Sequence, residues 1–141
     1  IRDRLGLVPK KNLPNYSEFY EMRHFEPANE ELDYIEYPGE EEQEWIPFGM
    51  QQIFYCPQME GLTVAAEICE DLWVPQPPSI THAIAGANVI VNLSASDEIT
   101  GKDSYRRNLV GGQSARLVCG YLCRTQSDRR KRNNPCTVKT L

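Results

Sequence analysis

The sequence has no apolar run near the length of about 18 residues that a membrane-spanning helix needs. Its first four residues, IRDR, are too charged for the apolar stretch of a secretory signal peptide. No internal repeat is visible, and 141 residues with 40% hydrophobic content are enough to bury one core. We therefore expect a cytoplasmic protein with no membrane partner, made of one domain or of part of one.

Cysteine and histidine are sparse and irregularly placed. The five cysteines, at positions 56, 69, 119, 123 and 136, are odd in number and do not form the regular framework of a disulfide-bonded scaffold. Cys119 and Cys123 are spaced like half of a zinc site, but no second pair follows, and His24 and His82 are far away in the sequence. We expect reduced thiols and no metal.

Basic residues are few outside the end of the chain. Residues 1–123 contain nine basic and nineteen acidic residues, whereas residues 124–141 contain six basic and one acidic. Such an acidic body repels the phosphates of nucleic acid, so we expect no nucleic-acid partner. The basic run RRKR at 129–132 is compatible with nucleic-acid binding or nuclear import, but a solvated, disordered tail is the simpler interpretation.

Two short apolar runs separated by a helical pattern predict a mixed α/β fold. Residues 62–68 and 88–93 have the length and β-branching of buried strands, and residues 80–87, with Ser79 as the cap, are predicted to form a helix. Strand, helix and strand in this order indicate a parallel crossover unit. A second helix is expected at 104–122, where Leu109, Leu117 and Tyr121 recur at roughly helical spacing.

The remaining segments carry weaker signals. Residues 17–25 are predicted to start a short helix, and residues 51–55 to be ordered. Residues 26–44 hold nine acidic residues and no basic one, with Pro38 and Gly39 in the middle, which is typical of an exposed loop.

Reactive side chains follow both predicted strands. Cys69 comes directly after the first strand, and Ser94 and Ser96 follow the second. The carboxyl ends of parallel strands meet at one edge of a sheet, where ligands bind in α/β proteins. A thiol is mostly protonated at neutral pH, so a nucleophilic Cys69 needs a nearby cation, for which Lys10 on its proline-flanked loop is the candidate. The alternative is that Cys69 is a small residue of the core.

Several motifs decide between these alternatives through a family resemblance. They are VPKKNLPNYSEFYE at 8–21, IPFG at 46–49, EICEDLWVP at 67–75, PPS at 77–79, AGA at 85–87, NLSAS at 92–96, GK at 101–102 and QSAR at 113–116. In this order they resemble the glutaminase domain, a nitrilase-like carbon-nitrogen hydrolase, of the glutamine-dependent NAD synthetases. The likeness runs from Val8 to about Leu122.

The resemblance implies part of a nitrilase-like α-β-β-α sandwich in residues 1–122, without the N-terminal part of that domain. It maps Lys10 and Cys69 onto two members of a Glu-Lys-Cys triad, whose general-base glutamate has no match in this chain. Glu18 or Glu21 resembles an additional glutamate of related amidases. The residues that match the glutamine-binding groups are Tyr16, Glu70, Ser96 and Lys102.

The implied reaction is hydrolysis of glutamine through a Cys69 thioester, with release of ammonia for NAD synthesis. Implied partners are glutamine, the synthetase domain of the parent chain and further copies of the intact enzyme. This domain itself needs no cofactor, because ATP and magnesium serve only the synthetase domain. Two alternatives stay open: another nitrilase-like amidase, and a catalytically dead fragment with a structural or interaction role.

The sequence departs from the family's pattern after Leu122. There the composition changes from acidic to basic, and the residues that the family has next are missing. We hypothesise that residues 123–141 form a basic, disordered tail that a shift of the reading frame has produced.

Overall fold

The computed structural model describes residues 5–38, 43–96 and 99–125. Its main feature is a sheet of four strands in the order β3-β4-β5-β6. The first pair is antiparallel and the other two pairs are parallel. The strands are β3 (Phe54–Tyr55), β4 (Thr63–Ile68), β5 (Val89–Ser94) and β6 (Gly120–Thr125). The strands predicted at 62–68 and 88–93 are therefore confirmed as β4 and β5.

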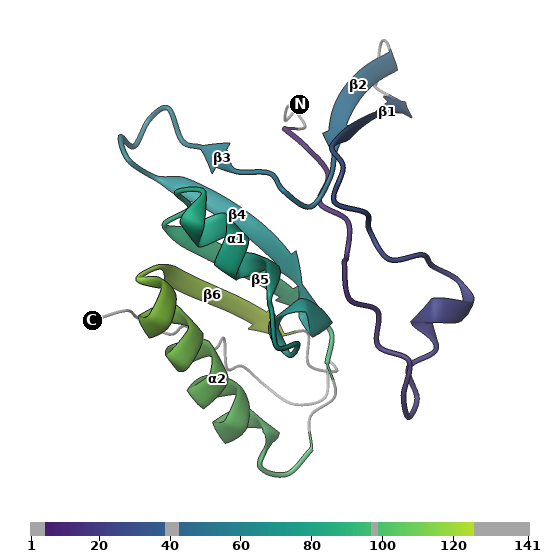
Figure 1. Cartoon of the computed structure of the whole chain (residues 1–141), viewed down its shortest axis with the longest axis vertical. Helices are drawn as coiled ribbons and strands as arrows, with labels where there is room; N and C mark the ends of the chain where they lie inside the picture. Colours follow the sequence, from purple (N-terminus) through teal and green to yellow (C-terminus); the bar gives the residue numbers. More distant parts are fainter. Residues whose placement is uncertain (1–4, 39–42, 97–98, 126–141) are drawn as a thin grey trace.

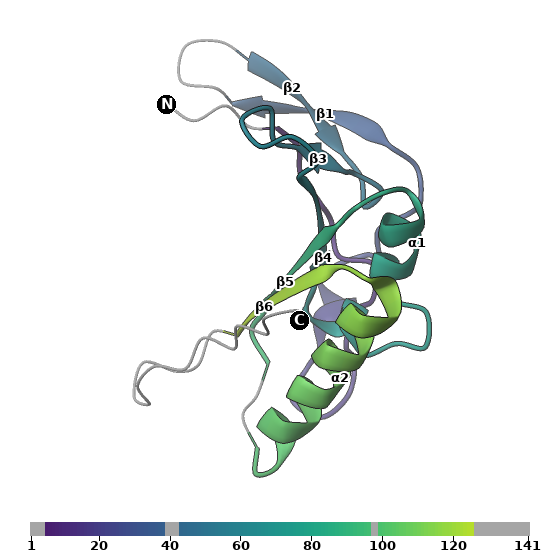
Figure 2. The same ribbon diagram turned by 90° about the vertical axis from the view of Figure 1, so that its left-hand side faces the viewer.

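Two helices make the crossovers between the parallel strands. The 3-10 turn η2 (Cys69–Leu72) and helix α1 (Pro78–Ile84) connect β4 to β5, and helix α2 (Lys102–Leu117) connects β5 to β6. Both helices lie on the same face of the sheet (Figure 2). None of the helices among the described residues is long and apolar enough to cross a membrane. The mixed α/β fold is confirmed, with one sheet and one helix layer of the expected sandwich.

The core lies between the sheet and these helices. Because side chains alternate across a strand, Ala65, Ile90 and Tyr121 point to the helix face and are fully buried against Val110 and Leu72. The opposite face is also apolar but less covered, since Leu93 exposes 59% of its surface. The strands are thus buried mainly on one face.

Residues 26–44 are not simply a loop, which corrects the prediction. They contain strand β1 (Asp33–Pro38), which pairs antiparallel with β2 (Gln43–Phe48) and forms a hairpin apart from the main sheet (Figure 1). Ile35 pairs with Ile46, which is buried, while Trp45 on the other face is 68% exposed. A half-buried strand needs only alternate apolar residues, so the acidic composition concealed it.

The predicted helix at 104–122 is wrong at its end. Helix α2 stops at Leu117, and Val118 has a left-handed conformation with φ of 53° that turns the chain into β6. Tyr121 extended the helical spacing of apolar residues beyond this turn. It is buried in the sheet, however, and does not belong to the helix. β6 was therefore missed.

Two further helix predictions need correction. Residues 17–25 form only a three-residue 3-10 turn, η1 (Glu21–Arg23), and α1 begins one residue before Ser79. Ser79 is not the cap, since Pro77 occupies that position. The backbone N–H of Ser79 instead donates to the Glu67 carboxylate. Of the segment predicted to be ordered at 51–55, only Phe54–Tyr55 is a strand.

The basic tail lies largely outside the described residues. β6 runs through Cys123 to Thr125, whereas residues 126–141, with the run at 129–132 and Cys136, are not described. The domain boundary at residue 122 and the disordered, frame-shifted tail stay predictions.

A pH-dependent stability follows from the buried Tyr121. Burial raises the pKa of Tyr121, and the adjacent Glu67 carboxylate raises it further. An unfolded tyrosine ionises near pH 10. Above that pH the unfolded chain loses this proton while the folded chain keeps it, so the free energy of unfolding falls, by up to about 1.4 kcal/mol per pH unit.

Urea unfolding followed by tryptophan fluorescence between about pH 7 and pH 11 measures this slope. The control is Tyr121→Phe, which we expect to lower the free energy of unfolding by about 1–3 kcal/mol because Glu67 loses a donor. Above pH 10 the free energy of unfolding of this variant should fall less steeply with pH than that of the unchanged chain. Burial also raises the pKa of the Cys119 thiol, and that contribution is common to both proteins. An unchanged slope in the variant would contradict the assignment.

Candidate active site

Cys69 lies at the carboxyl end of β4 in a strained turn. Its φ of 49° is left-handed, a conformation that residues other than glycine rarely adopt. The turn continues directly into η2, which ends at Leu72. This geometry takes the thiol out of the alternating pattern of the strand and presents it at the edge of the sheet.

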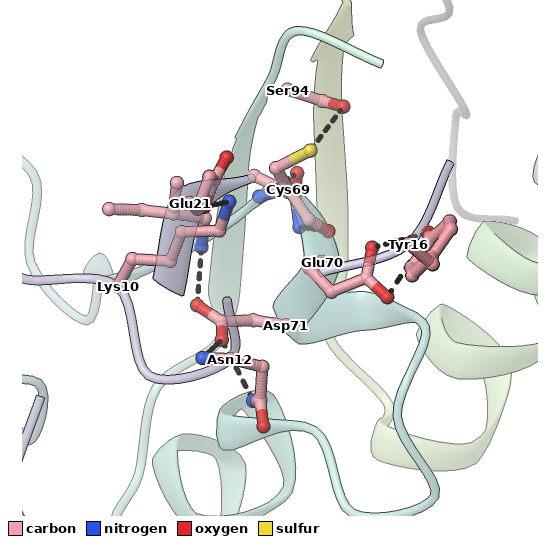
Figure 3. Close-up of polar contacts among 10 residues, drawn as sticks. Lys10, Asn12, Tyr16, Glu21, Cys69, Glu70, Asp71 and Ser94 are labelled. Atoms are coloured by element: carbon pink, nitrogen blue, oxygen red, sulfur yellow. Dashed lines mark hydrogen bonds and ion pairs between the residues drawn. The ribbon is translucent and has the colours of Figure 1, made fainter. Parts of the chain in front are cut away.

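The Cys69 side chain lines a cavity of about 500 Å³ together with Lys10 and Glu21. The Lys10 ammonium donates to a Glu21 carboxylate oxygen at 2.5 Å, and only 14% of the lysine side chain is exposed (Figure 3). Most of the other lining is apolar, with Leu13, Phe19, Phe25, Phe48, Ile68 and Leu93 among it. Charges in such a cavity interact more strongly than in water.

The structure thus brings together the two residues predicted to be catalytic, although 59 residues separate Lys10 and Cys69 in the sequence. Glu21, one of the two glutamates considered beside them, contacts Lys10. The catalytic roles themselves stay predictions.

Two of the predicted substrate-binding residues contact each other next to Cys69. The Tyr16 hydroxyl donates to the Glu70 carboxylate, with oxygen–oxygen distances of 3.1 and 3.4 Å (Figure 3). Tyr16 is 57% exposed, so the pair lies at the surface. A carboxylate and a hydroxyl in this arrangement suit the ammonium group of an amino acid.

The other two predicted substrate-binding residues lie beyond β5. Ser96 is half-buried in the segment that follows the strand, and Lys102 is the first residue of α2. The Lys102 ammonium is 5.7 Å from the centre of the Trp73 ring, which stacks on Tyr105 at 5.6 Å. None of the four predicted substrate-binding residues is among the residues that line the Cys69 cavity.

Three contacts to this site were not assigned from the sequence. The Ser94 hydroxyl donates to the Cys69 sulfur at 3.4 Å, so Ser94 lies in direct contact with the thiol. The Asn92 side chain accepts a hydrogen bond from the Cys69 backbone N–H at 3.2 Å. Asp71 accepts one from the N–H of Ile68 at 2.9 Å. The available signal was an asparagine within the otherwise apolar run 89–93.

In residues 5–38, 43–96 and 99–125, no three or more His, Cys, Asp or Glu side chains are grouped so that they could hold an ion. The chemistry that this arrangement can perform is nucleophilic, because a thiol and an ammonium group line the same cavity.

Known proteins resemble this chain over most of its length. The glutamine-dependent NAD(+) synthetase of Mycobacterium tuberculosis (strain H37Rv) is 41% identical over 118 residues, which are 84% of this chain and 17% of that protein. The chain is homologous to one segment of the glutamine-dependent NAD(+) synthetases. The human protein of that name is 32% identical over 115 residues, covering 77% of this chain and 16% of its own length. No family model matches the chain.

A solved structure gives the same picture for the fold. Glutamine-dependent NAD+ synthetase from Acinetobacter baumannii, in complex with ADP, superposes with a TM-score of 0.60 at 20% identity. The match covers 83% of this chain and 18% of the other. At that identity the likeness shows the fold alone. The chain spans about a sixth of the length of the curated relatives that it matches.

The two neighbouring lysines provide a matched test of the cavity. Lys10 lines the same cavity as Cys69, whereas Lys11 pairs with exposed Glu30 at 2.7 Å and lowers the pKa of that carboxyl. We expect Lys10→Met to slow the alkylation of Cys69 by iodoacetamide severalfold, because the variant removes a cation that lines the same cavity as the thiol. Mass spectrometry of the Cys69 peptide measures the rate. Lys11→Met is the control, and equal slowing in both variants would show that Lys10 has no special role.

Proposed function

We propose that this chain carries the cysteine nucleophile of a glutamine amidohydrolase that releases ammonia for NAD synthesis. The observation that carries the proposal is the shared cavity of Cys69 and Lys10, beside which Tyr16 and Glu70 form a polar pair. Homology to the glutamine-dependent NAD(+) synthetases supports glutamine as the nitrogen donor.

The proposed reaction begins with attack of the Cys69 thiolate on the side-chain carbonyl carbon of glutamine. The negative charge that develops on the carbonyl oxygen is stabilised by the Lys10 ammonium and by the backbone N–H of Glu70. The carbon–nitrogen bond then breaks, ammonia leaves with the proton of the thiol, and a thioester remains. Water cleaves the thioester to glutamate and restores the thiol. The Ser94 hydroxyl, which donates to the sulfur, stabilises the thiolate.

The proposed binding mode divides the charges of glutamine between two sides of the site. Glu70, with Tyr16 bonded to it, receives the α-ammonium group. Lys102 and Ser96 receive the α-carboxylate, as a cation and a hydroxyl suit that group. The stack of Trp73 on Tyr105 lies beneath Lys102 and limits where its ammonium can go.

The proposal extends to the parent enzyme. There the ammonia passes to a synthetase domain that uses ATP and magnesium, and the intact enzyme is a homo-oligomer, while the glutaminase domain needs no cofactor. No residue of this chain matches the general-base glutamate of the family's triad. Since that base assists both proton transfers, we expect the isolated chain to hydrolyse little or no glutamine.

A diazo-ketone analogue of glutamine tests the proposal without requiring turnover. We expect the Cys69 sulfur to be alkylated with loss of dinitrogen, and excess glutamine to prevent this, whereas simple amides do not. Glu70→Gln and Lys102→Met should reduce protection by glutamine at least roughly tenfold, because each removes one charge-assisted contact. Mass spectrometry of the labelled chain measures the extent.

The controls separate the competing functions. Cys69→Ala should abolish labelling, and iodoacetamide should still alkylate Cys69 in Glu70→Gln at the unchanged rate. Equal protection by simple amides would favour another nitrilase-like amidase. Failure of the analogue to label a chain that unfolds cooperatively would favour a catalytically dead fragment.

A further inference from the structure

One buried carboxylate connects the two halves of the candidate site. Asp71, the third residue of η2, exposes only 1% of its surface. One of its oxygens accepts a hydrogen bond from the Ile68 N–H at 2.9 Å. The other accepts two from Asn12, from the backbone N–H at 2.8 Å and from the side-chain amide at 2.9 Å (Figure 3). Asp71 thus joins the residue before Cys69 to the second residue after Lys10.

The segment that carries Lys10 has few other means of holding its position. Residues 8–14 are neither helix nor strand, and Pro9 and Pro14 have no N–H to donate. On one side Leu7 is anchored to the hairpin, where its N–H donates to Pro47 at 2.8 Å. The Lys10 carbonyl accepts from Ala28 N–H at 3.0 Å. These contacts fix the segment to the hairpin and to the loop that precedes the hairpin, but not to the turn that holds the thiol.

We infer that Asp71 is a positioning residue that holds Lys10 at the wall of the cavity that Cys69 also lines. The inference rests on the proposed function, in which Lys10 assists the reaction of the Cys69 nucleophile. Asp71 touches neither the substrate nor the reacting atoms, and it acts through the loop that it holds. The three N–H donors account for its burial, because a buried carboxylate is stable only when its oxygens are hydrogen-bonded.

Asparagine at this position has the same shape but the wrong hydrogen-bonding pattern. Its amide nitrogen would face either the Ile68 N–H or the two donors of Asn12, and donors repel each other. Asp71→Asn therefore releases the Lys10 loop with little change in volume. Asn12→Ala is a milder variant, since it removes one of the three bonds and leaves the backbone N–H bonded.

A double-mutant cycle tests whether Asp71 acts through Lys10. The rate of Cys69 alkylation by iodoacetamide is measured in the purified chain, in Asp71→Asn, in Lys10→Met and in the double variant. We expect each single variant to react severalfold more slowly, and the double variant to react no more slowly than Lys10→Met alone. A purely structural role predicts instead that the two effects multiply.

Every other result also decides the question. The inference would be overturned if the slowing in the double variant were the product of the two single effects. It would also be overturned if Asp71→Asn slowed alkylation while Lys10→Met did not, or if Asp71→Asn left the rate unchanged. If Asp71→Asn loses its cooperative unfolding transition, Asn12→Ala replaces it in the cycle, with a smaller slowing that should likewise vanish in the Lys10→Met background. Asp33→Asn, which alters an exposed carboxylate bonded to a backbone N–H, should leave the rate unchanged.

The iodoacetamide cycle is independent of the substrate. If glutamine is not the substrate, the diazo-ketone analogue labels none of the variants. The cycle still reports whether Asp71 and Lys10 are coupled. If only the positioning role is wrong, the analogue labels the chain and the cycle shows no coupling.

Discussion

The site depends on how one peptide segment is held at the end of β4. A left-handed Cys69 costs about 1 kcal/mol or more, so the neighbouring contacts have to stabilise it. The Asn92 side-chain amide contacts both backbone polar groups of Cys69. Its oxygen accepts from the Cys69 N–H at 3.2 Å, and its nitrogen lies 3.5 Å from the Cys69 carbonyl oxygen. Asp71 holds the preceding N–H. These contacts fix the backbone from which the thiol projects, and Cys69 lines the same cavity as Lys10.

The orientation of Asn92 depends in turn on a polar layer inside the sheet. Glu67 of β4 pairs in register with Asn92 of β5, and the Tyr121 hydroxyl of β6 donates to the Glu67 carboxylate. Glu67 also accepts the Ser79 N–H in the first turn of α1 at 2.9 Å. A sheet that only had to be stable would place apolar side chains there, because buried polar groups gain little beyond their own desolvation. Their presence directly beneath Cys69 ties the helix layer to the turn that presents the thiol.

The sequence predicted those parts of this arrangement that local patterns describe. β4 and β5 were evident as short β-branched runs, and the position of Cys69 followed from the end of β4. β6 was not evident from the sequence. Tyr121 continues the apolar spacing of α2, although the chain has already turned at Val118. Contacts between distant residues leave no local pattern, and 59 residues separate Asn12 from Asp71. Only the family motifs indicated that Lys10 and Cys69 belong together.

Reactivity and substrate choice reside in differently constrained parts of the molecule. The residues that fix the thiol, among them Asp71 and Asn92, are buried and serve the fold as well, so changing them disturbs both. The residues proposed to bind glutamine lie on loop and helix ends, and Tyr16 and Glu70 meet at the surface. Exposed charges of this kind contribute little to stability. Under the proposed function, substitutions at the exposed residues therefore change which amide is accepted while the thiol beneath stays in place.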